Sequence, residues 1–505
     1  MRAFAWLPAV ALGLAGCAVG PDYHSPKTTV PDGFAAATAA AAQSQAAADM
    51  VRWWQSLNDP ELDSLVERAI QANPSLEIAL TRLQEARTFE VAITGRALPT
   101  VDASVGAGRG TGTDLTRGRT TPPLTAGSNT TGYEHITTIA GFDAAWEIDL
   151  FGKYRREIEA ARADTQAAAE LRNEVLITAV ADLARTYLDM RGLQMQAVVL
   201  QRNIDTAQRL LELVQARYQR GIINELDVML AQRQLATLKS QTAPIQSQID
   251  AAQYAIAALL GRYPEDLQQE LAQPGLLPLL PQQVEAGLPL DLLRRRPDIR
   301  EAERQLAGAT ARIGVATANL FPQLVITGGA GYQFQGLGVT PVQNKFIWSA
   351  GVGAIWPLLD FGTLDALVDI ADLRTHEQLI YYRQTVQNAV REVDTAISGY
   401  AAQQDRVRNL GDALEASQRA VSLATQRYDR GLTDFLNVVD AERQQYDLEL
   451  QYAGAQMTVA EQYVALYKGL GGGWEEYQSI PPIRQPQPAV VAAFRRLLSP
   501  EDPQK

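Results

Sequence analysis

The sequence predicts a mainly α-helical fold with a β-barrel part, in which two similar structural repeats follow one another along 505 residues. Three observations predict this fold class. Characteristic residues recur at a constant offset, as Trp146 does at Trp356 (356 − 146 = 210). Two long segments are almost free of glycine and proline, which favours long helices. The segments ahead of them alternate apolar and small residues, which is the two-residue period of a strand.

The offset of 210 positions holds from Trp146 to Gly261 in the first copy, so no insertion or deletion separates the copies there. The first copies are Trp146, Phe151-Gly152, Arg217-Tyr218, Arg220-Gly221, Leu226, Val228, Ala231, Arg233-Gln234 and Leu260-Gly261. A period this long indicates a duplicated half-molecule and not a short solenoid repeat.

The N-terminus is predicted to be a targeting segment. Arg2 is followed by a short apolar run, and Leu14 to Cys17 reads Leu-Ala-Gly-Cys, a lipobox. We therefore expect a signal peptide at 1–16 and a lipid on Cys17, the only cysteine. The alternative is an ordinary cleavable signal with an incidental cysteine. The Ala-, Pro- and Gly-rich residues 17–59 then form a lipidated N-terminal arm.

The first repeat is predicted at 60–263. A helical pattern runs from Pro60 to Leu98 and stops at Pro99. Strands joined by a long Gly/Thr/Pro-rich loop follow within 100–150. This part of the repeat is therefore a helix followed by a β-hairpin.

The helical hairpin of the first repeat spans 153–260. Lys153 to Gln219 contains no proline and one glycine, and a helix of this length would extend about 100 Å. Gly221 is placed to end it. The return helix, Glu225 to Leu260, would extend only about 55 Å. We therefore expect the helix before the strands and the return helix to stack end to end along the long one.

The second half repeats this order. A Pro-rich linker at 264–297 leads to the second repeat at 298–474. That repeat contains strands within 323–358 and a helical hairpin at 363–468, and residues 475–505 form a C-terminal tail. The tail is Pro-rich after Pro481 and is expected to be irregular.

Composition excludes several classes of function. The net charge is −12, with 45 basic and 57 acidic residues, which argues against a nucleic-acid partner. His24, His135 and His376 are isolated, without the spacing of metal ligands or of a catalytic nucleophile and its base. The protein is therefore predicted not to be an enzyme and to need no metal or cofactor.

Four strands of membrane-spanning length cannot close a barrel alone, and open sheet edges are not tolerated in lipid. The strands must therefore be shared between subunits. A dimer would give eight strands with a filled interior, and a trimer would give twelve and leave room for a pore. Geometry alone leaves both open. Long helices facing one another would continue such a barrel as a conduit.

The motifs of the chain resemble those of the TolC/OprM outer-membrane efflux family. They are Trp53-Trp54, Asp59-Pro60-Glu61-Leu62, Arg294-Arg295-Arg296-Pro297-Asp298-Ile299, both Arg-Tyr-x-Arg-Gly copies and Leu470-Gly471-Gly472-Gly473-Trp474. The lipobox and Gly20-Pro21-Asp22-Tyr23 are similar to those of its NodT-type lipoprotein branch.

The resemblance implies a homotrimer in the outer membrane, with a twelve-stranded β-barrel continued by a twelve-helix α-barrel in the periplasm. It implies a passive exit duct for small molecules such as drugs and toxic organics. A periplasmic adaptor and an inner-membrane pump, often of the RND type, would be its partners. The alternative is the outer-membrane duct of a type I protein secretion system.

The resemblance also implies a periplasmic gate at the second hairpin tip. Leu436 falls on its apolar constriction position, Asp440 on an acidic ring position, and Asn437 where TolC carries a second Asp. Without the resemblance, Leu436 reads as a core residue and Asp440 as a solvated helix charge.

Other tip residues are expected to hold this gate. Arg427 and Tyr428 match positions that tether the inner hairpin to its neighbours, and Asp227 is an expected partner of Arg427. Gly221 and Gly431 end the two long helices at the tips. The alternative is that the repeated Arg-Tyr pairs serve only to cap helices.

Overall fold

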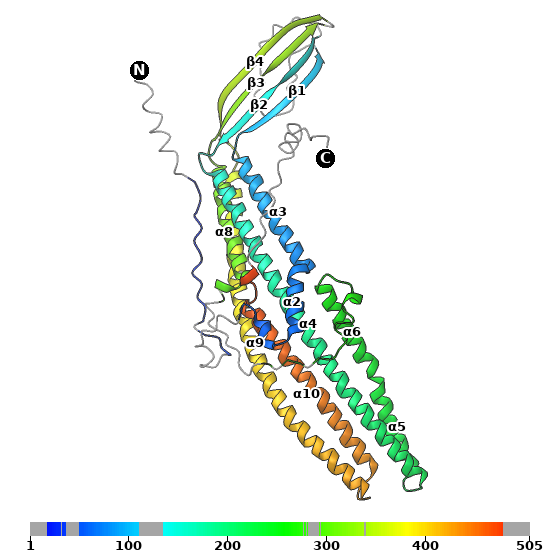
Figure 1. The fold of residues 1–505 in the computed structure, drawn as a ribbon. Helices are drawn as coiled ribbons and strands as arrows, with labels where there is room; N and C mark the ends of the chain where they lie inside the picture. Colours follow the sequence, from blue (N-terminus) through cyan, green and yellow to red (C-terminus); the bar gives the residue numbers. More distant parts are fainter. Residues whose placement is uncertain are drawn as a thin grey trace.

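The computed structural model describes residues 18–31, 33–36, 50–110, 135–275, 277–278, 280, 292, 294–337 and 340–477. The signal peptide 1–16, Cys17, the loop between the first two strands and the tail beyond 477 lie outside the described residues. A four-stranded sheet lies at one end of an elongated molecule, and helices run from it to two tips at the other end (Figure 1).

The sheet is antiparallel, in the order β1-β2-β3-β4. Its strands are β1 (Thr100–Gly110), β2 (His135–Ile148), β3 (Gln323–Leu337) and β4 (Thr340–Ile355). The two halves of the chain meet between β2 and β3, where glycine lets the backbones approach: a Cβ on Gly141 would lie 2.9 Å from the Cα of Gly331. β1 and β4 are the edges of the sheet within the chain.

The first half contains five α-helices among the described residues. They are α2 (Pro60–Ala72), α3 (Pro74–Arg96), α4 (Lys153–Gln219), α5 (Glu225–Ser240) and α6 (Thr242–Leu259). α4 has the predicted bounds. The prediction of one helix from Pro60 to Leu98 is wrong, because Asn73 is extended (ψ 123°) between α2 and α3. Pro74 disfavours the helical conformation of the residue before it, and the Asn73 side chain instead caps α3 by accepting from Leu76 N–H.

The predicted continuous return helix, Glu225 to Leu260, is also wrong. The structure divides it at Gln241 into α5 and α6. Pro244 lies in the first turn of α6, the place where a helix tolerates a residue without an N–H. The missing donor therefore explains why one helix ends and another begins just before it.

The second half contains three α-helices among the described residues: α8 (Pro297–Ala318), α9 (Thr363–Asp429) and α10 (Phe435–Leu470). α4 and α9 both contain 67 residues. Both begin after a glycine in the left-handed conformation, Gly152 at φ +81° and Gly362 at φ +80°. The short 3₁₀ helices are η2 (Trp53–Leu57), η3 (Pro264–Asp266) and η4 (Glu475–Tyr477).

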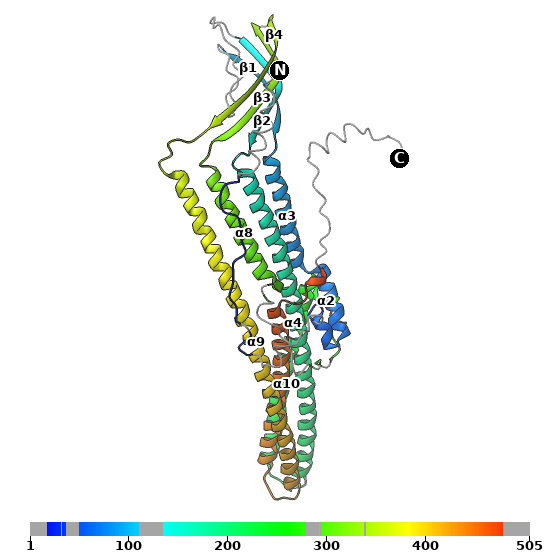
Figure 2. The same ribbon diagram turned by 90° about the vertical axis from the view of Figure 1, so that its left-hand side faces the viewer.

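α4 lies at the centre of the helical part. Close to the sheet it packs between α3 and α8, and α9 covers the far side of α8 (Figures 1 and 2). Towards the tips it packs between α5 and α10, and α9 covers the far side of α10. This is the end-to-end stacking expected along α4. In this layer α9 forms one flank, and α3, α5 and α6 form the other.

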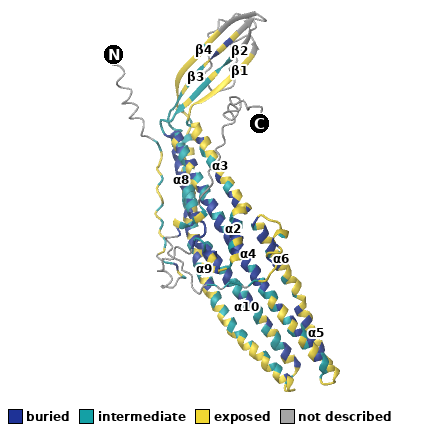
Figure 3. Cartoon of the chain, viewed as in Figure 1, coloured by how far each residue is buried: buried dark blue, intermediate teal, exposed yellow. Residues whose placement is uncertain are grey.

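The main core lies at mid-height, where most buried residues gather (Figure 3). Trp53 and Trp54 of η2 are buried there, and the Trp53 ring stacks on Tyr467 of α10 with centroids 5.3 Å apart. Aromatic burial at this level fixes the N-terminal segment against the last helix. Among the described residues, no helix is both long and apolar enough to cross a membrane.

Candidate functional site

The candidate site lies at the two helix tips, the end of the molecule farthest from the sheet (Figure 1). Residues 220–224 connect α4 to α5, and residues 430–434 connect α9 to α10. The two turns lie next to one another in both views (Figures 1 and 2). The two hairpins therefore meet at this end of the molecule.

Both tips use the same backbone turn. Gly221 (φ +71°) and Gly431 (φ +69°) donate their N–H groups to the carbonyl three residues earlier, at 2.8 and 2.9 Å. The following N–H bonds the carbonyl five residues earlier, at 3.1 and 2.8 Å, which completes a Schellman cap. Nothing lies within 4 Å of where a Cβ would stand, so the backbone conformation requires glycine and space does not.

A contact between the hairpins joins the tips. Arg217 of α4 pairs with Asp429 of α9 at 2.8 Å, and its guanidinium lies 5.1 Å from the centroid of the Tyr428 ring. Tyr428 is buried and packs against Phe435, with ring centroids 5.3 Å apart. Arg217 therefore ties the first hairpin to the second by charge and by cation–π contact. Sequence reasoning allowed it only a capping role.

The expected pair of Asp227 with Arg427 is not formed within the chain. Among the described residues, the Arg427 side chain makes no ion pair or hydrogen bond. Burial, and then the nearby Asp434 carboxylate, raise the pKa of Asp227. Arg217 instead takes the position between the hairpins because its partner Asp429 lies on the facing end of α9. A pair between Asp227 and Arg427 of different copies stays a prediction.

The predicted gate residues lie on the first turns of α10. Leu436 is 55% exposed, and Asn437 donates to the hydroxyl of Thr433 at 2.8 Å. Asp440 accepts from Arg443 at 3.0 Å and from Gln444 at 2.8 Å, both on the same helix. The apolar side chain therefore faces outward and is free to meet another copy, while the acidic group carries its own basic neighbour.

Two half-buried carboxyl groups along α10 were not predicted. Burial, and then Glu461 of α10, raise the pKa of Asp189 on α4 to about 7. Burial raises the pKa of Glu442 to about 7 as well. Both carboxyl groups lie where helices pack together. The periodicity of the sequence can identify such a position as buried, but it does not show which charged group lies opposite.

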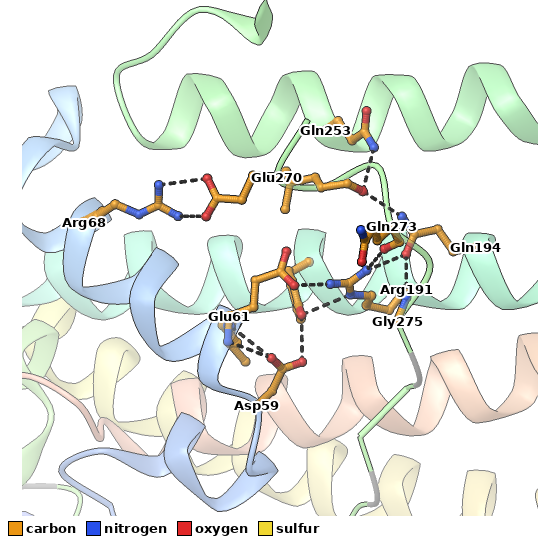
Figure 4. Close-up of polar contacts among 12 residues, drawn as sticks. Asp59, Glu61, Arg68, Arg191, Gln194, Gln253, Glu270, Gln273 and Gly275 are labelled. Carbon is orange, nitrogen blue, oxygen red and sulfur yellow. Dashed lines mark hydrogen bonds and ion pairs between the residues drawn. The ribbon is translucent and has the colours of Figure 1, made fainter. Parts of the chain in front are cut away.

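Sequence reasoning also missed a polar network at mid-height (Figure 4). Arg191 of α4 is buried and pairs with Glu61 of α2. It also donates to the Tyr187 hydroxyl (3.0 Å), to Gln194 (2.8 Å) and to the carbonyl of Gln273 (2.7 Å). A buried guanidinium needs this many acceptors to offset its desolvation. Polar residues interrupting the buried face of α4 are the signal that could have located it.

The same network extends to the segment after η3 (Figure 4). Gln194 and Gln253 both donate to the carbonyl of Leu271, at 3.0 and 3.1 Å. Arg68 of α2 makes two bonds to Glu270, at 2.6 and 3.1 Å. These bonds hold the beginning of the linker against α4 and α6. In the described part of the chain, no group of three or more His, Cys, Asp and Glu is placed to hold a metal ion.

Comparison with known proteins identifies this arrangement. The profile of the family described as "Outer membrane efflux protein" matches residues 65–262 and 288–472. The chain belongs to this family. Its relatives include the pyoverdine export outer membrane protein OpmQ of Pseudomonas putida, which is 32% identical over 441 residues, or 86% of this chain and 90% of OpmQ. Nodulation protein T of Rhizobium leguminosarum is 29% identical over 471 residues, or 92% of this chain and 97% of that protein.

Solved structures show the same fold. The outer-membrane channel OprN superposes with a TM-score of 0.81 at 33% identity, covering 92% of this chain and all of OprN. The open state of the Neisseria gonorrhoeae channel MtrE gives a TM-score of 0.75 at 28% identity, covering 91% and 99%. This outer membrane efflux protein is therefore an efflux duct of the outer membrane, with its helices in the periplasm. Its family and structural neighbours are channels and transport components.

Proposed function

We propose that three copies of the chain form one duct with a twelve-stranded β-barrel. The observation that carries this is the pair of free sheet edges at β1 and β4. Three successive antiparallel pairings make β1 and β4 antiparallel, so β1 of one copy can pair with β4 of the next. Open edges are not tolerated in lipid, and twelve strands leave a pore where eight would be filled by side chains.

The helical part supports the same assembly. Large apolar side chains are exposed on both flanks of the layer, such as Phe89 and Val91 on α3 and Leu373 and Ile380 on α9. Exposed apolar side chains at this density favour burial against another subunit. Packing α9 of one copy against α3 and α5 of the next makes a closed wall of twelve helices, with two similar repeats per subunit.

The tips form an iris-like gate in this proposal. Three copies of Leu436 constrict the opening, and three Asp440 carboxylates repel one another when they come close. The ion pair with Arg443 reduces this repulsion and so favours closure. Arg427 then tethers α9 to a neighbouring copy, where Asp227 is available, while the buried Tyr428 holds the two hairpin tips together within one copy.

A periplasmic adaptor and an inner-membrane pump of the RND type supply the cargo, and lipid on Cys17 anchors each subunit. Relatives named for solvent export support small apolar molecules as cargo: the solvent efflux pump outer membrane protein SrpC of Pseudomonas putida is 30% identical over 486 residues, 94% of this chain and 100% of SrpC. Co-purification with an RND pump supports this pairing. Co-purification with an ABC exporter would instead favour the type I secretion duct.

Planar-bilayer conductance tests the gate. Leu436→Ala and Arg427→Ala are each expected to raise the closed-state conductance, because they remove part of the constriction and of its tether. In Asp440→Ala the lost side-chain bulk at the opening is expected to outweigh the lost repulsion, so the conductance rises as well. Leu226→Ala is the matched control, since Leu226 lies 210 positions earlier and is similarly exposed, 61% against 55%. Unchanged conductance in all three variants, or an equal rise in the control, contradicts the gate assignment. Heat-modifiable migration of a trimer tests the assembly separately.

A further inference from the structure

The N-terminal arm is an ordered strap. Residues 18–31 and 33–36 run alongside α8 and α9, from the junction of sheet and helices towards mid-height (Figures 1 and 2). The arm contacts three helices that are far apart in the sequence. Such an arm has no core of its own, so its path depends on a few specific contacts.

The strongest of these contacts is made by Arg156 on the first turn of α4. Its side chain is only 6% exposed, and it bonds the carbonyls of Val19 (3.2 Å) and Gly20 (3.3 Å) and the carboxylate of Asp22 (2.7 Å). It also pairs with Glu159 at 2.8 Å. The arm thus supplies three of the acceptors that a buried guanidinium requires.

Close backbone contacts fix the register of the arm at the same place. Gly20 has φ +89°, and a Cβ there would lie 2.4 Å from the Cα of Gly314 in α8. A Cβ on Gly152 would lie 2.6 Å from the Cα of Ala18. The N–H of Val19 bonds the carbonyl of Phe151 at 3.0 Å. No larger residue fits either crossing without displacing backbone, so the arm cannot slide by one residue.

Weaker contacts follow farther along the arm. The Tyr23 hydroxyl donates to Glu303 at 3.1 Å, and the Arg304 guanidinium lies 5.6 Å from the Tyr23 ring centroid. Thr28 donates to the Tyr382 hydroxyl at 3.2 Å, and the N–H of Ala36 bonds Asp394 at 3.1 Å. Each of these contacts is a single side-chain interaction, whereas residues 18–22 are held by several hydrogen bonds and by close backbone packing.

We propose that residues 18–22 are a clasp that sets where the lipid anchor meets the membrane, with Arg156 as its positioning residue. Ala18 directly follows Cys17, and consecutive Cα atoms are about 3.8 Å apart. A lipid on the preceding residue would therefore enter the membrane beside the junction of strands and helices, where the clasp holds Ala18. This consequence rests on the proposed lipidation, whereas the clasp itself does not.

Tryptic cleavage of the full-length protein in its membrane tests the clasp. Lys27 is the only lysine or arginine between Cys17 and Arg52, and it is exposed, so cleavage there reports lifting of the arm. Arg156→Ala is expected to speed cleavage at Lys27 about tenfold, because local opening sets the rate of proteolysis. Arg162→Ala is the control, since Arg162 lies on the same helix and bonds Glu90 of α3. Equal cleavage of the two variants overturns the clasp.

A glycine pair removes the concern that Arg156→Ala weakens α4 itself. Gly20→Ala is expected to release the arm as strongly, because of its φ and its contact with Gly314. Gly33→Ala is the matched control, since nothing lies within 4 Å of a Cβ at that position. Release by Gly20→Ala with an unchanged helical melting temperature supports the clasp. Protection of Lys27 in Gly20→Ala overturns it.

A double-mutant cycle tests the link to the anchor. The yield of heat-modifiable trimer in the membrane is measured for Arg156→Ala, Cys17→Ser and both together. If the clasp acts by placing the lipid, the second change adds no further loss to the first. Additive losses overturn the anchoring role. If Cys17 carries no lipid but the clasp exists, Cys17→Ser leaves the trimer yield unchanged and Lys27 stays protected from trypsin. This outcome contradicts the proposed lipidation without contradicting the clasp.

Discussion

α4 and α9 have the same length and the same caps, yet 27 residues of α4 are buried and only 7 of α9. Their position in the layer explains the difference. α4 packs against α3, α5, α6, α8 and α10, whereas α9 packs chiefly against α8 and α10. Two helices from similar sequence motifs therefore have opposite roles. α4 is the central helix of the chain, and α9 is a flank with exposed apolar side chains, which the proposed trimer would bury against another copy.

This difference bears on how a gate can move. The hairpin of α9 and α10 meets the first hairpin mainly along the seam of α10 with α4 and at the Arg217–Asp429 pair. Residues 401–427 of α9 include no buried residue, so this part of the flank can shift without exposing the core that α9 shares with α4 at mid-height. A moving element must come from the less stable part of a structure, and α9 meets that condition better than α4.

The largest expected difference between the two helices concerns a buried and an exposed arginine. Arg191→Ala on α4 is expected to destabilise the protein by about 3–5 kcal/mol, because it leaves the Glu61 carboxylate partly buried and unpaired. Arg419→Ala on α9 is the control, since that side chain is 74% exposed and pairs only with Glu415 one turn away. Guanidinium unfolding followed by the helical circular dichroism signal measures both.

Equal shifts of the two unfolding midpoints would contradict the central role of α4. Arg191→Lys sharpens the test. A lysine keeps the charge but not the planar fork that reaches Tyr187, Gln194 and Gln273 together. It is therefore expected to recover only part of the stability.

A smaller effect is expected from the carboxyl group of Asp189 on α4. Its pKa is raised from the usual 3.8 to about 7, so between those values the native state binds more protons than the unfolded state. Its contribution to stability is complete below pH 3.8 and is lost as the pH rises through about 7. Asp189→Asn is expected to make the melting temperature fall less steeply across this window.

The matched control for Asp189 is Asp405→Asn on α9, whose carboxylate is exposed and pairs with Arg408 one turn away. Melting curves at a series of pH values compare the three proteins. If Asp189→Asn and the unchanged protein show the same pH dependence, the protonation of Asp189 beside Glu461 is not coupled to folding.

The long helices, the strands and the tips could be predicted because local signals define them. Proline-free length, two-residue alternation and glycines such as Gly221 and Gly431 depend on nearby residues. The breaks at Asn73 and Gln241 also have a local cause, because Pro74 and Pro244 follow them closely. The apolar periodicity continues across both prolines, and for this reason it predicts one continuous helix at each place where the structure has two.

The side-chain contacts could not be predicted in the same way. Arg156 and Arg191 both find acceptors on segments more than a hundred residues away in the sequence. Their helical spacing marks a buried face but does not name the partner. Arg217 rather than Arg427 bridges the tips within the chain because the facing residue is Asp429, which follows from how the hairpins pack and not from either copy of the motif.

The smallest expected difference separates the two return helices at their first residues. Asn224 accepts from the N–H of Asp227 at 3.2 Å and caps α5, whereas the Asp434 side chain makes no capping bond on α10. Asn224→Ala is expected to cost about 1 kcal/mol locally, so that amides in the first turn of α5 exchange about fivefold faster.

Asp434→Ala is expected to leave the exchange of α10 unchanged and to lower the pKa of Asp227, since Asp434 helps to raise it. Hydrogen exchange measures the caps and NMR titration measures Asp227. If Asp434→Ala speeds exchange in α10 while Asn224→Ala leaves α5 unchanged, the second tip depends on its own cap and not on the proposed contacts with other copies.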